Sequence, residues 1–218
     1  MSKNQFWVLA SLMFLILLFV ACQPLTGNEP SSTPFVSSEP IANYSYAEFM
    51  RDPKCYSPCW VGIQVGLTTF DEAKNILTSR YGKKNISIIN SNSISWKASS
   101  IDGLREGIVN LSDDIVSEIM LFPDQRVFFE VNDLLKIFSE PTWVQVFQDP
   151  NNSCHGISLL YSEIGVYVIL DLEDGSKGVL PSQSIFLVRM LDSALTRNWN
   201  AYDSILIRWD GYKNYCQE

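Results

Sequence analysis

Residues 68–82 read Thr-Thr-Phe-Asp-Glu-Ala-Lys-Asn-Ile-Leu-Thr-Ser-Arg-Tyr-Gly, and they predict a well-marked helix. Thr69 and Glu72 have the spacing of a capping box, in which each side chain bonds the other residue's backbone N–H. Gly82 supplies the stop signal. The apolar side chains share one face at helical spacing, at Phe70, Ala73, Ile76 and Leu77. We therefore expect an amphipathic helix with one face packed on a sheet.

Short β-type runs follow this helix, separated by polar turn residues. They cover residues 86–89, 94–96, 107–111 and 115–122. A shorter helix is predicted before them at 46–51, where Ser45 and Glu48 form a second capping box and Pro53 ends the helix.

The same order then recurs about 60 residues later. Val131, Leu134, Leu135 and Phe138 predict a helix that must end before Pro141. Further strands are predicted at 143–147, 157–161, 166–172 and 185–190, with a turn at Asp174-Gly175 and a last strand at 204–209. We interpret the chain as α+β, a tandem repeat of a helix followed by a three- to four-stranded antiparallel sheet. The expected units are residues 44–125 and 126–218.

The N-terminus has the parts of a secretory signal: Lys3, then an apolar run at 6–21 broken only by a serine, then Cys22. The run has 16 residues, and about 20 are needed to span the hydrocarbon of a bilayer. The sequence from Phe19 to Cys22 resembles the bacterial lipobox, although that pattern prefers leucine where Phe19 stands. We expect residues 1–21 to be removed and Cys22 to carry lipid. Ordinary cleaved secretion and an uncleaved anchor are the alternatives.

Residues 22–43 are rich in proline, serine and threonine, and this composition predicts a disordered tether. The net charge of −8 argues against nucleic acid and against electrostatic binding to anionic lipid. Membrane contact is therefore expected from the lipid alone. The expected location is a cell membrane, on its extracytoplasmic side, with an outer membrane included where the cell has one.

Four cysteines remain once Cys22 is assigned to lipid: Cys55, Cys59, Cys154 and Cys216. An even number in an exported chain favours two disulfides, and the three pairings stay open. Structural zinc is the competing reading, but the Cys-x3-Cys spacing with no nearby histidine fits it poorly. Free or partly paired thiols are the third possibility. We expect no metal and no cofactor.

Two segments around the first helix resemble a signature of uncharacterised bacterial lipoproteins. They read Pro58-Cys59-Trp60-x-Gly62-Ile63 and Gly66-x-Thr68-Thr69-x-x-Glu72-Ala73. The second segment is more distantly similar to the BamE/SmpA-like lipoproteins of outer-membrane assembly. In that family Gly-x-Pro follows the helix, whereas Lys83 and Lys84 follow here. The resemblance implies a fold, which tandem modules of secreted protein inhibitors share, and implies no activity.

Catalytic motifs are scarce in this sequence. His155 is the single histidine and follows Cys154, but neighbouring strand residues point to opposite faces and exported cysteines are usually oxidised. The acidic run from Asp171 to Gly175 lacks the ligand spacing of a calcium loop. Glycine-rich nucleotide motifs and Gly-x-Ser-x-Gly are missing. We therefore expect that the protein is not an enzyme.

The aromatic tail is the remaining candidate site. Trp199, Trp209 and Tyr212 could stack on sugar rings or anchor a protein partner, although core packing is the more common role of such residues. The leading hypothesis is a non-enzymatic lipoprotein that binds another protein, such as an envelope assembly partner or a protease-type target. The alternative is a binding module for sugar or cell-wall polymer that uses the tail aromatics.

Overall fold

The structure is a computed structural model of the 218-residue chain. It describes residues 58–99, 103–124, 126, 129–148, 154–172, 178–192 and 204–216. Several predictions of the sequence lie outside these ranges and stay predictions. They concern the signal peptide, Cys22, the tether, the helix at 46–51, Cys55, the turn at Asp174-Gly175 and Trp199.

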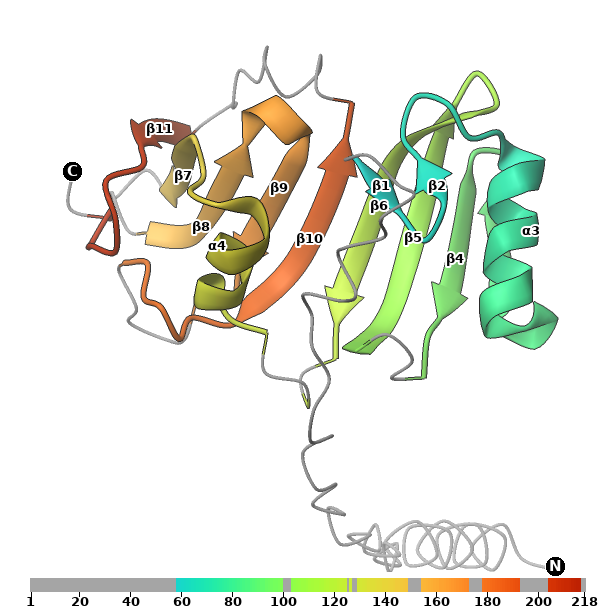
Figure 1. The fold of residues 1–218 in the computed structure, drawn as a ribbon, viewed down its shortest axis with the longest axis horizontal. Coiled ribbons are helices and arrows are strands. Elements are labelled where there is room, and N and C mark those ends of the chain that lie inside the picture. The colour runs from blue at the N-terminus through green and yellow to red at the C-terminus, as the bar shows by residue number, and fades with distance from the viewer. Residues whose placement is uncertain are drawn as a thin grey trace, which may run out of the picture. The chain divides into compact units, whose positions relative to one another are not determined.

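The described part is α+β, with two α-helices and a nine-stranded antiparallel sheet (Figure 1). The helices are α3 (Phe70–Tyr81) and α4 (Val131–Phe138). The strands of the sheet are β3 (Ile86–Asn90), β4 (Ser93–Lys97), β5 (Leu104–Ser112), β6 (Ile115–Pro123), β7 (Trp143–Gln148), β8 (Cys154–Tyr161), β9 (Val166–Leu170), β10 (Ile185–Leu191) and β11 (Ser204–Arg208). Each helix and each main strand was expected from the sequence, with boundaries that differ by a few residues.

The strand order is β11-β7-β8-β9-β10-β6-β5-β4-β3. Each helix is followed by four strands that pair in chain order, β3 to β6 and β7 to β10. The last strands of the two sets, β6 and β10, then pair antiparallel with Met120 opposite Arg189. The expectation of two separate sheets was therefore wrong. Joining them satisfies the backbone groups of β6 and β10, which would otherwise be two exposed edges.

Helix α3 begins as its sequence predicts. The Glu72 backbone N–H donates to Thr69 Oγ1 at 3.4 Å, and the Thr69 backbone N–H donates to Glu72 Oε2 at 2.9 Å. Both bonds of the capping box are thus present. The helix ends at Gly82, whose φ of 81° lies in the left-handed region that glycine adopts without strain.

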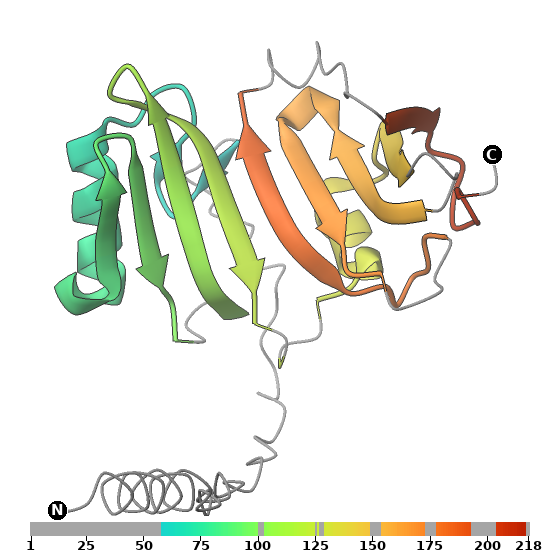
Figure 2. The same ribbon diagram turned by 180° about the vertical axis from the view of Figure 1, so that it is seen from behind.

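Both helices cover the same face of the sheet, and Figures 1 and 2 show this face and the opposite one. Beneath them lies one hydrophobic cluster that draws residues from both sets of strands, for example Ile94 and Val109 from the first and Leu159 and Val188 from the second. The core is therefore continuous across the pairing of β6 with β10.

A small hairpin, β1 (Cys59–Trp60) and β2 (Ile63–Gln64), also packs on the helix side, and the sequence did not predict it. Trp60 stacks on Trp96 with ring centroids 5.2 Å apart and on Tyr81 at 6.2 Å. Tyr81 and Trp96 are 6.0 Å apart. These three rings fasten the hairpin and α3 to strand β4.

The C-terminal segment adds the last strand at one end of the sheet. Strand β11 pairs along β7, from Ser204 opposite Phe147 to Arg208 opposite Trp143. Beyond it Tyr215 is fully buried in the main core. The strand predicted at 204–209 is therefore confirmed as an addition to the second set of strands.

Candidate functional site

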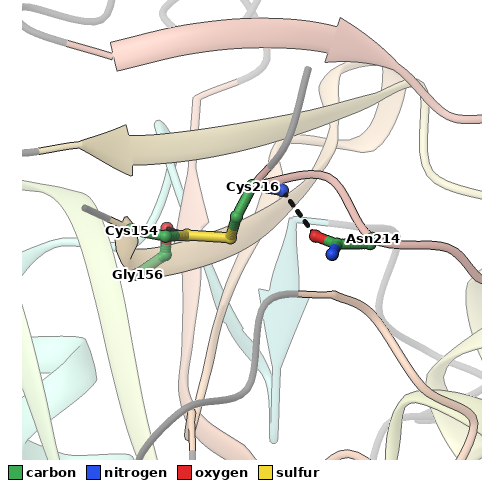
Figure 3. The surroundings of a disulfide bond; sticks show 4 residues. All are labelled: Cys154, Gly156, Asn214 and Cys216. Atoms are coloured by element: carbon green, nitrogen blue, oxygen red, sulfur yellow. Dashed lines mark hydrogen bonds between the residues drawn. A yellow bond between two sulfur atoms is a disulfide. The ribbon is translucent and has the colours of Figure 1, made fainter. Parts of the chain in front are cut away.

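The cysteines of the folded part serve as cross-links. Cys154 and Cys216 form a disulfide with an S–S distance of 2.03 Å and a Cα–Cα distance of 5.6 Å (Figure 3). The Cys216 backbone N–H donates to Asn214 Oδ1 at 3.1 Å in the same turn. Cys59 is also disulfide-bonded, to a partner outside the described residues. The sulfur of Cys154 is thus unavailable as a thiolate nucleophile beside His155.

The structure brings two of the three candidate aromatics together. Trp209 meets Tyr212 edge to face, with centroids 5.7 Å apart and planes at 82°. The other partner of Trp209 is Tyr215, stacked at 6.1 Å with planes at 18°. Tyr215 itself is pinned, because its hydroxyl accepts from the Asp210 backbone N–H at 3.0 Å and donates to the Gly211 carbonyl at 2.8 Å.

This packing decides what the tail aromatics can contact. Trp209 is half-buried and lies against the core, and Tyr212 keeps 39% of its surface exposed. Desolvation by its surroundings raises the pKa of Tyr212, while the positive charge of Lys136 lowers it. The cluster therefore joins the tail to the body and leaves one ring, Tyr212, for an external ligand.

The sheet face opposite the helices presents a different set of side chains. Strand register places Ile108 beside Met120, Met120 beside Arg189, and Arg189 beside Tyr167 in one row across four strands. Their chain neighbours, such as Val109 and Val188, point to the helix-covered core instead, as the alternation of strands requires. This face can be viewed in Figure 2.

Charges on this face are paired with each other. Arg189 Nη2 lies 2.5 Å from Glu118 Oε1, and Asn110 Nδ2 donates to Glu118 Oε2 at 2.8 Å. The Arg189 guanidinium also sits over the Tyr167 ring, 5.7 Å from its centroid. Burial raises the pKa of Tyr167, and the positive charge of Arg189 opposes that shift. The centre of the face is therefore electrically balanced.

Next to this ion pair lies what we name the sheet-face patch, formed by Ile108, Met120, Phe122 and Phe186. Phe122 and Phe186 meet edge to face at 6.2 Å, and Phe186 keeps 43% of its surface exposed. The other three side chains are half-buried. The patch draws on three neighbouring strands, β5, β6 and β10, and no described helix covers it.

Basic and acidic side chains border the patch and are paired too. The Arg105 guanidinium lies 5.7 Å from the centroid of the Phe122 ring and bonds Glu106 at 3.0 Å. A second, smaller buried cluster follows further along the same face, made of Leu160, Tyr167 and Leu191.

The sheet-face patch was not predicted from the sequence, although one signal was available. Residues 119–122 are four consecutive apolar residues, Ile-Met-Leu-Phe, so strand β6 is apolar on both of its faces. Such a run is typical of a strand that is covered on both sides. Phe186 could not be added from the sequence, because it reaches Phe122 only through the pairing of β10 with β6.

Three further observations concern a possible active site, a metal site and a membrane-spanning helix. A shallow cleft of about 470 Å³ lies beside α3, and its one carboxylate, Glu72, is held by the Thr69 cap. Within the described ranges, no cluster of three or more histidine, cysteine, aspartate or glutamate side chains is placed to hold a metal ion. No helix in the same ranges is long and apolar enough to cross a membrane.

No protein-family model, no curated protein and no solved structure matches this chain.

Proposed function

We propose that this chain is a lipid-anchored extracytoplasmic protein whose folded part is a non-enzymatic module that binds another protein through the sheet-face patch. The observation that carries the proposal is the partly exposed aromatic and aliphatic surface on a sheet face that no helix of the described residues covers (Figure 2). Phe186 and Phe122 are residues of the type that anchors protein interfaces. Isolated apolar residues on a surface are ordinary, whereas a contiguous apolar patch is typical of an interaction site and so supports the proposal.

The charges around the patch indicate what kind of partner surface can bind there. Glu118 with Arg189 and Glu106 with Arg105 satisfy each other, so a charged partner gains little by binding here. A matching surface of apolar side chains with a polar rim fits better. Burial of Phe186 and Met120 would then supply most of the binding free energy.

We also propose that the two sets of helix and four strands are a tandem repeat. Reading outward from β6 and β10, each set runs through its strands in reverse chain order. The sheet-face patch lies at the junction, since β5 and β6 come from the first set and β10 from the second. A partner bound there contacts both units at once.

The proposed anchor rests on the lipobox-like sequence ending in Cys22. The described cysteines agree with an exported chain, because Cys154 and Cys216 are paired with each other and Cys59 is disulfide-bonded. Metabolic labelling of a bacterial host with a palmitate analogue tests this. The full chain should be labelled and fractionate with membranes, and Cys22→Ser should lose both properties. A label that survives in Cys22→Ser contradicts the proposal.

Site-specific photocrosslinking in intact cells tests the binding surface. A photoreactive phenylalanine analogue at Phe186 should capture a distinct protein band. The same analogue at Leu180, which is 53% exposed and outside the patch, should not. Met120→Lys in the Phe186 probe should abolish the band. Capture that is equal at both positions, or absent at both, argues against the patch as a docking surface.

Binding of sugar or cell-wall polymer stays the alternative function, with Tyr212 as its accessible ring. Titration with glycans should then quench the fluorescence of nearby Trp209, and Tyr212→Ala should remove the response. Fluorescence that does not change across a glycan panel disposes of this alternative.

A further inference from the structure

Both edge strands of the nine-stranded sheet expose apolar side chains. Ile88 and Ile89 of β3 are 51% and 57% exposed, and Ile205 and Leu206 of β11 are 42% and 38% exposed. Exposed apolar residues are typical of sites that contact a protein or a membrane. Exposure does not set one edge apart from the other, but the charges beside the two strands do.

The segment that builds the β3 end of the sheet is basic. Residues 73–99 include five of the 16 basic residues of the chain and none of its 24 acidic ones. Residues 203–213, which contain β11, include two basic and two acidic residues. The net charge of −8 therefore conceals a positively charged segment at one end of the sheet.

The fold gathers four of these five cations at one corner. Arg80 lies in the last turn of α3, and Lys83 and Lys84 lie in the short 3-10 helix that leads from α3 into β3. Lys97 is the last residue of β4, at the end where β3 begins. The ends of α3 and β4 lie at the same edge of the molecule in Figure 1. We name the basic edge as these four cations together with Ile88 and Ile89.

The lysines of the basic edge can be reached by an external anion. All three are exposed, and within the described ranges Lys83, Lys84 and Lys97 form no ion pair. Glu106 lies opposite Lys97 in the register of β4 and β5, but it bonds Arg105 at 3.0 Å. The positive charge of these lysines is therefore not satisfied within the described part of the chain.

The segment that leads back to the proposed anchor joins the fold beside this corner. The described chain begins at residue 58, and Trp60 stacks on Trp96 at 5.2 Å and on Tyr81 at 6.2 Å. Trp96 precedes Lys97 in the chain, and Tyr81 follows Arg80. An anchor at Cys22 thus holds the basic edge closer to the membrane than the β11 end, which has no such junction.

We infer that the basic edge rests on anionic phospholipid headgroups of the membrane that holds the protein, an inference that depends on the lipid anchor proposed above. The four cations contact the phosphate groups, and Ile88 and Ile89 enter the interface between headgroups and acyl chains. The anchor selects this occupant, because a tethered surface is present at high effective concentration whereas a free acidic partner must arrive by diffusion. Membrane contact then involves the folded part as well as the lipid.

Fluorescence quenching of the full chain in vesicles tests this contact. A cysteine replaces Ile89, which has no partner in β4, and carries an environment-sensitive dye. Brominated lipids in the vesicles quench only a dye at the membrane, and the unaltered chain shows whether native cysteines take up the dye. Quenching should be strong in equal parts of phosphatidylglycerol and phosphatidylcholine and weak in phosphatidylcholine alone. Salt at about 1 M should abolish the difference, since it shortens the screening length to about 3 Å.

Two further variants separate the basic edge from other surfaces. Lys83→Gln/Lys84→Gln should lower the ratio of membrane-bound to free dye about fivefold for each lysine removed. Leu206→Cys places the dye on the other edge strand and should show no dependence on the charge of the lipid.

The outcomes are distinct from those for the anchor. Equal quenching in both kinds of vesicle, equal quenching at positions 89 and 206, or quenching that persists without the two lysines overturns the inference. A photoreactive analogue at Ile89 that captures a protein in intact cells overturns it as well. A chain that carries palmitate at Cys22 without quenching at position 89 refutes the basic edge and leaves the anchor standing, whereas a chain without lipid at Cys22 refutes both.

Discussion

A side chain at Gly107 would occupy space that the ring of Trp96 already fills. A Cβ atom built there lies 2.1 Å from Trp96 Cζ2. The ring cannot retreat, because Trp60 and Tyr81 stack on it at 5.2 and 6.0 Å. We expect Gly107→Ala to lower the free energy of unfolding by about 1–3 kcal/mol, the usual cost of overpacking. Urea denaturation followed by circular dichroism measures this.

Gly156→Ala is the matched control for that substitution. Gly156 also lies in a strand beside an aromatic ring, but its Cβ would lie 3.4 Å from Phe147 Cδ2, close to ordinary contact. Its effect should therefore be clearly smaller than that of Gly107→Ala. Equal losses in the two variants would mean that strand glycines matter here for a reason other than the Trp96 contact.

Glu72 gives α3 a dependence on pH. Its hydrogen bonds from the Thr69 backbone N–H and hydroxyl lower the pKa of the Glu72 carboxyl below its ordinary value of 4.5. The folded pKa is thus below the unfolded one. The contribution to stability is complete above the unfolded pKa and is lost as the pH falls through the folded pKa.

Glu72→Gln should accordingly flatten the fall in stability below about pH 4.5, the ordinary carboxyl pKa. Thermal unfolding between pH 3 and 7 measures the profile. Thr69→Ala removes the hydroxyl bond and keeps the backbone N–H bond to Glu72, so it should flatten the profile only in part, together with a loss of about 1 kcal/mol at neutral pH. A Thr69→Ala profile as steep as that of the unaltered chain would exclude the Thr69 hydroxyl as a contributor.

At the level of elements, the disulfide acts on β11. Removal of Cys154–Cys216, which joins residues 62 positions apart, should cost about 2–4 kcal/mol. In the double variant Cys154→Ser/Cys216→Ser, the amides of β11 should exchange with solvent faster than those of β5. Hydrogen exchange read by mass spectrometry shows this. Equal acceleration in both strands would mean that the bond stabilises the fold as a whole and does not hold the tail locally.

Helices and strands were predictable where their signals are local. Helix α3 carries its own cap and stop, and α4 carries its apolar spacing and Pro141. The hairpin of β1 and β2 was missed, because two-residue strands are too short to show alternation. The pairing that joins the two sets of strands was also missed, because the residues of β6 and β10 carry no signal that these two strands pair with each other.

The candidate sites were predictable in the same way: local patterns could be recognised in the sequence, and contacts between distant segments could not. The even cysteine set predicted disulfides in an exported chain, and one of them is now placed at Cys154–Cys216. The sequence offered Trp209 and Tyr212 as binding aromatics, but the role of Trp209 depends on Tyr215, which is drawn into the core beneath it. The sheet-face patch depends on strand register, which a single sequence does not reveal.

On the scale of the whole folded part, the continuous sheet and core predict cooperative unfolding. Circular dichroism and tryptophan fluorescence should report one coincident transition in urea. Ile94 and Ile157, one from each set of strands, are both fully buried. Ile94→Ala and Ile157→Ala should each cost about 2–5 kcal/mol and should shift the single transition as a unit. Two separable transitions would show that the halves fold independently.

The lateness of β11 in the chain has a consequence for assembly. The ribosome delivers β7 well before the strand that covers it, and a chain cut short ahead of residue 204 lacks that cover altogether. Such a molecule ends its sheet at β7, whose Val144 and Val146 are fully buried in the intact protein, and it lacks the buried ring of Tyr215. Until those residues are made, the edge of β7 is open to pairing with strands of other molecules. Synthesis of the C-terminal segment is thus the step that completes both the sheet and the core.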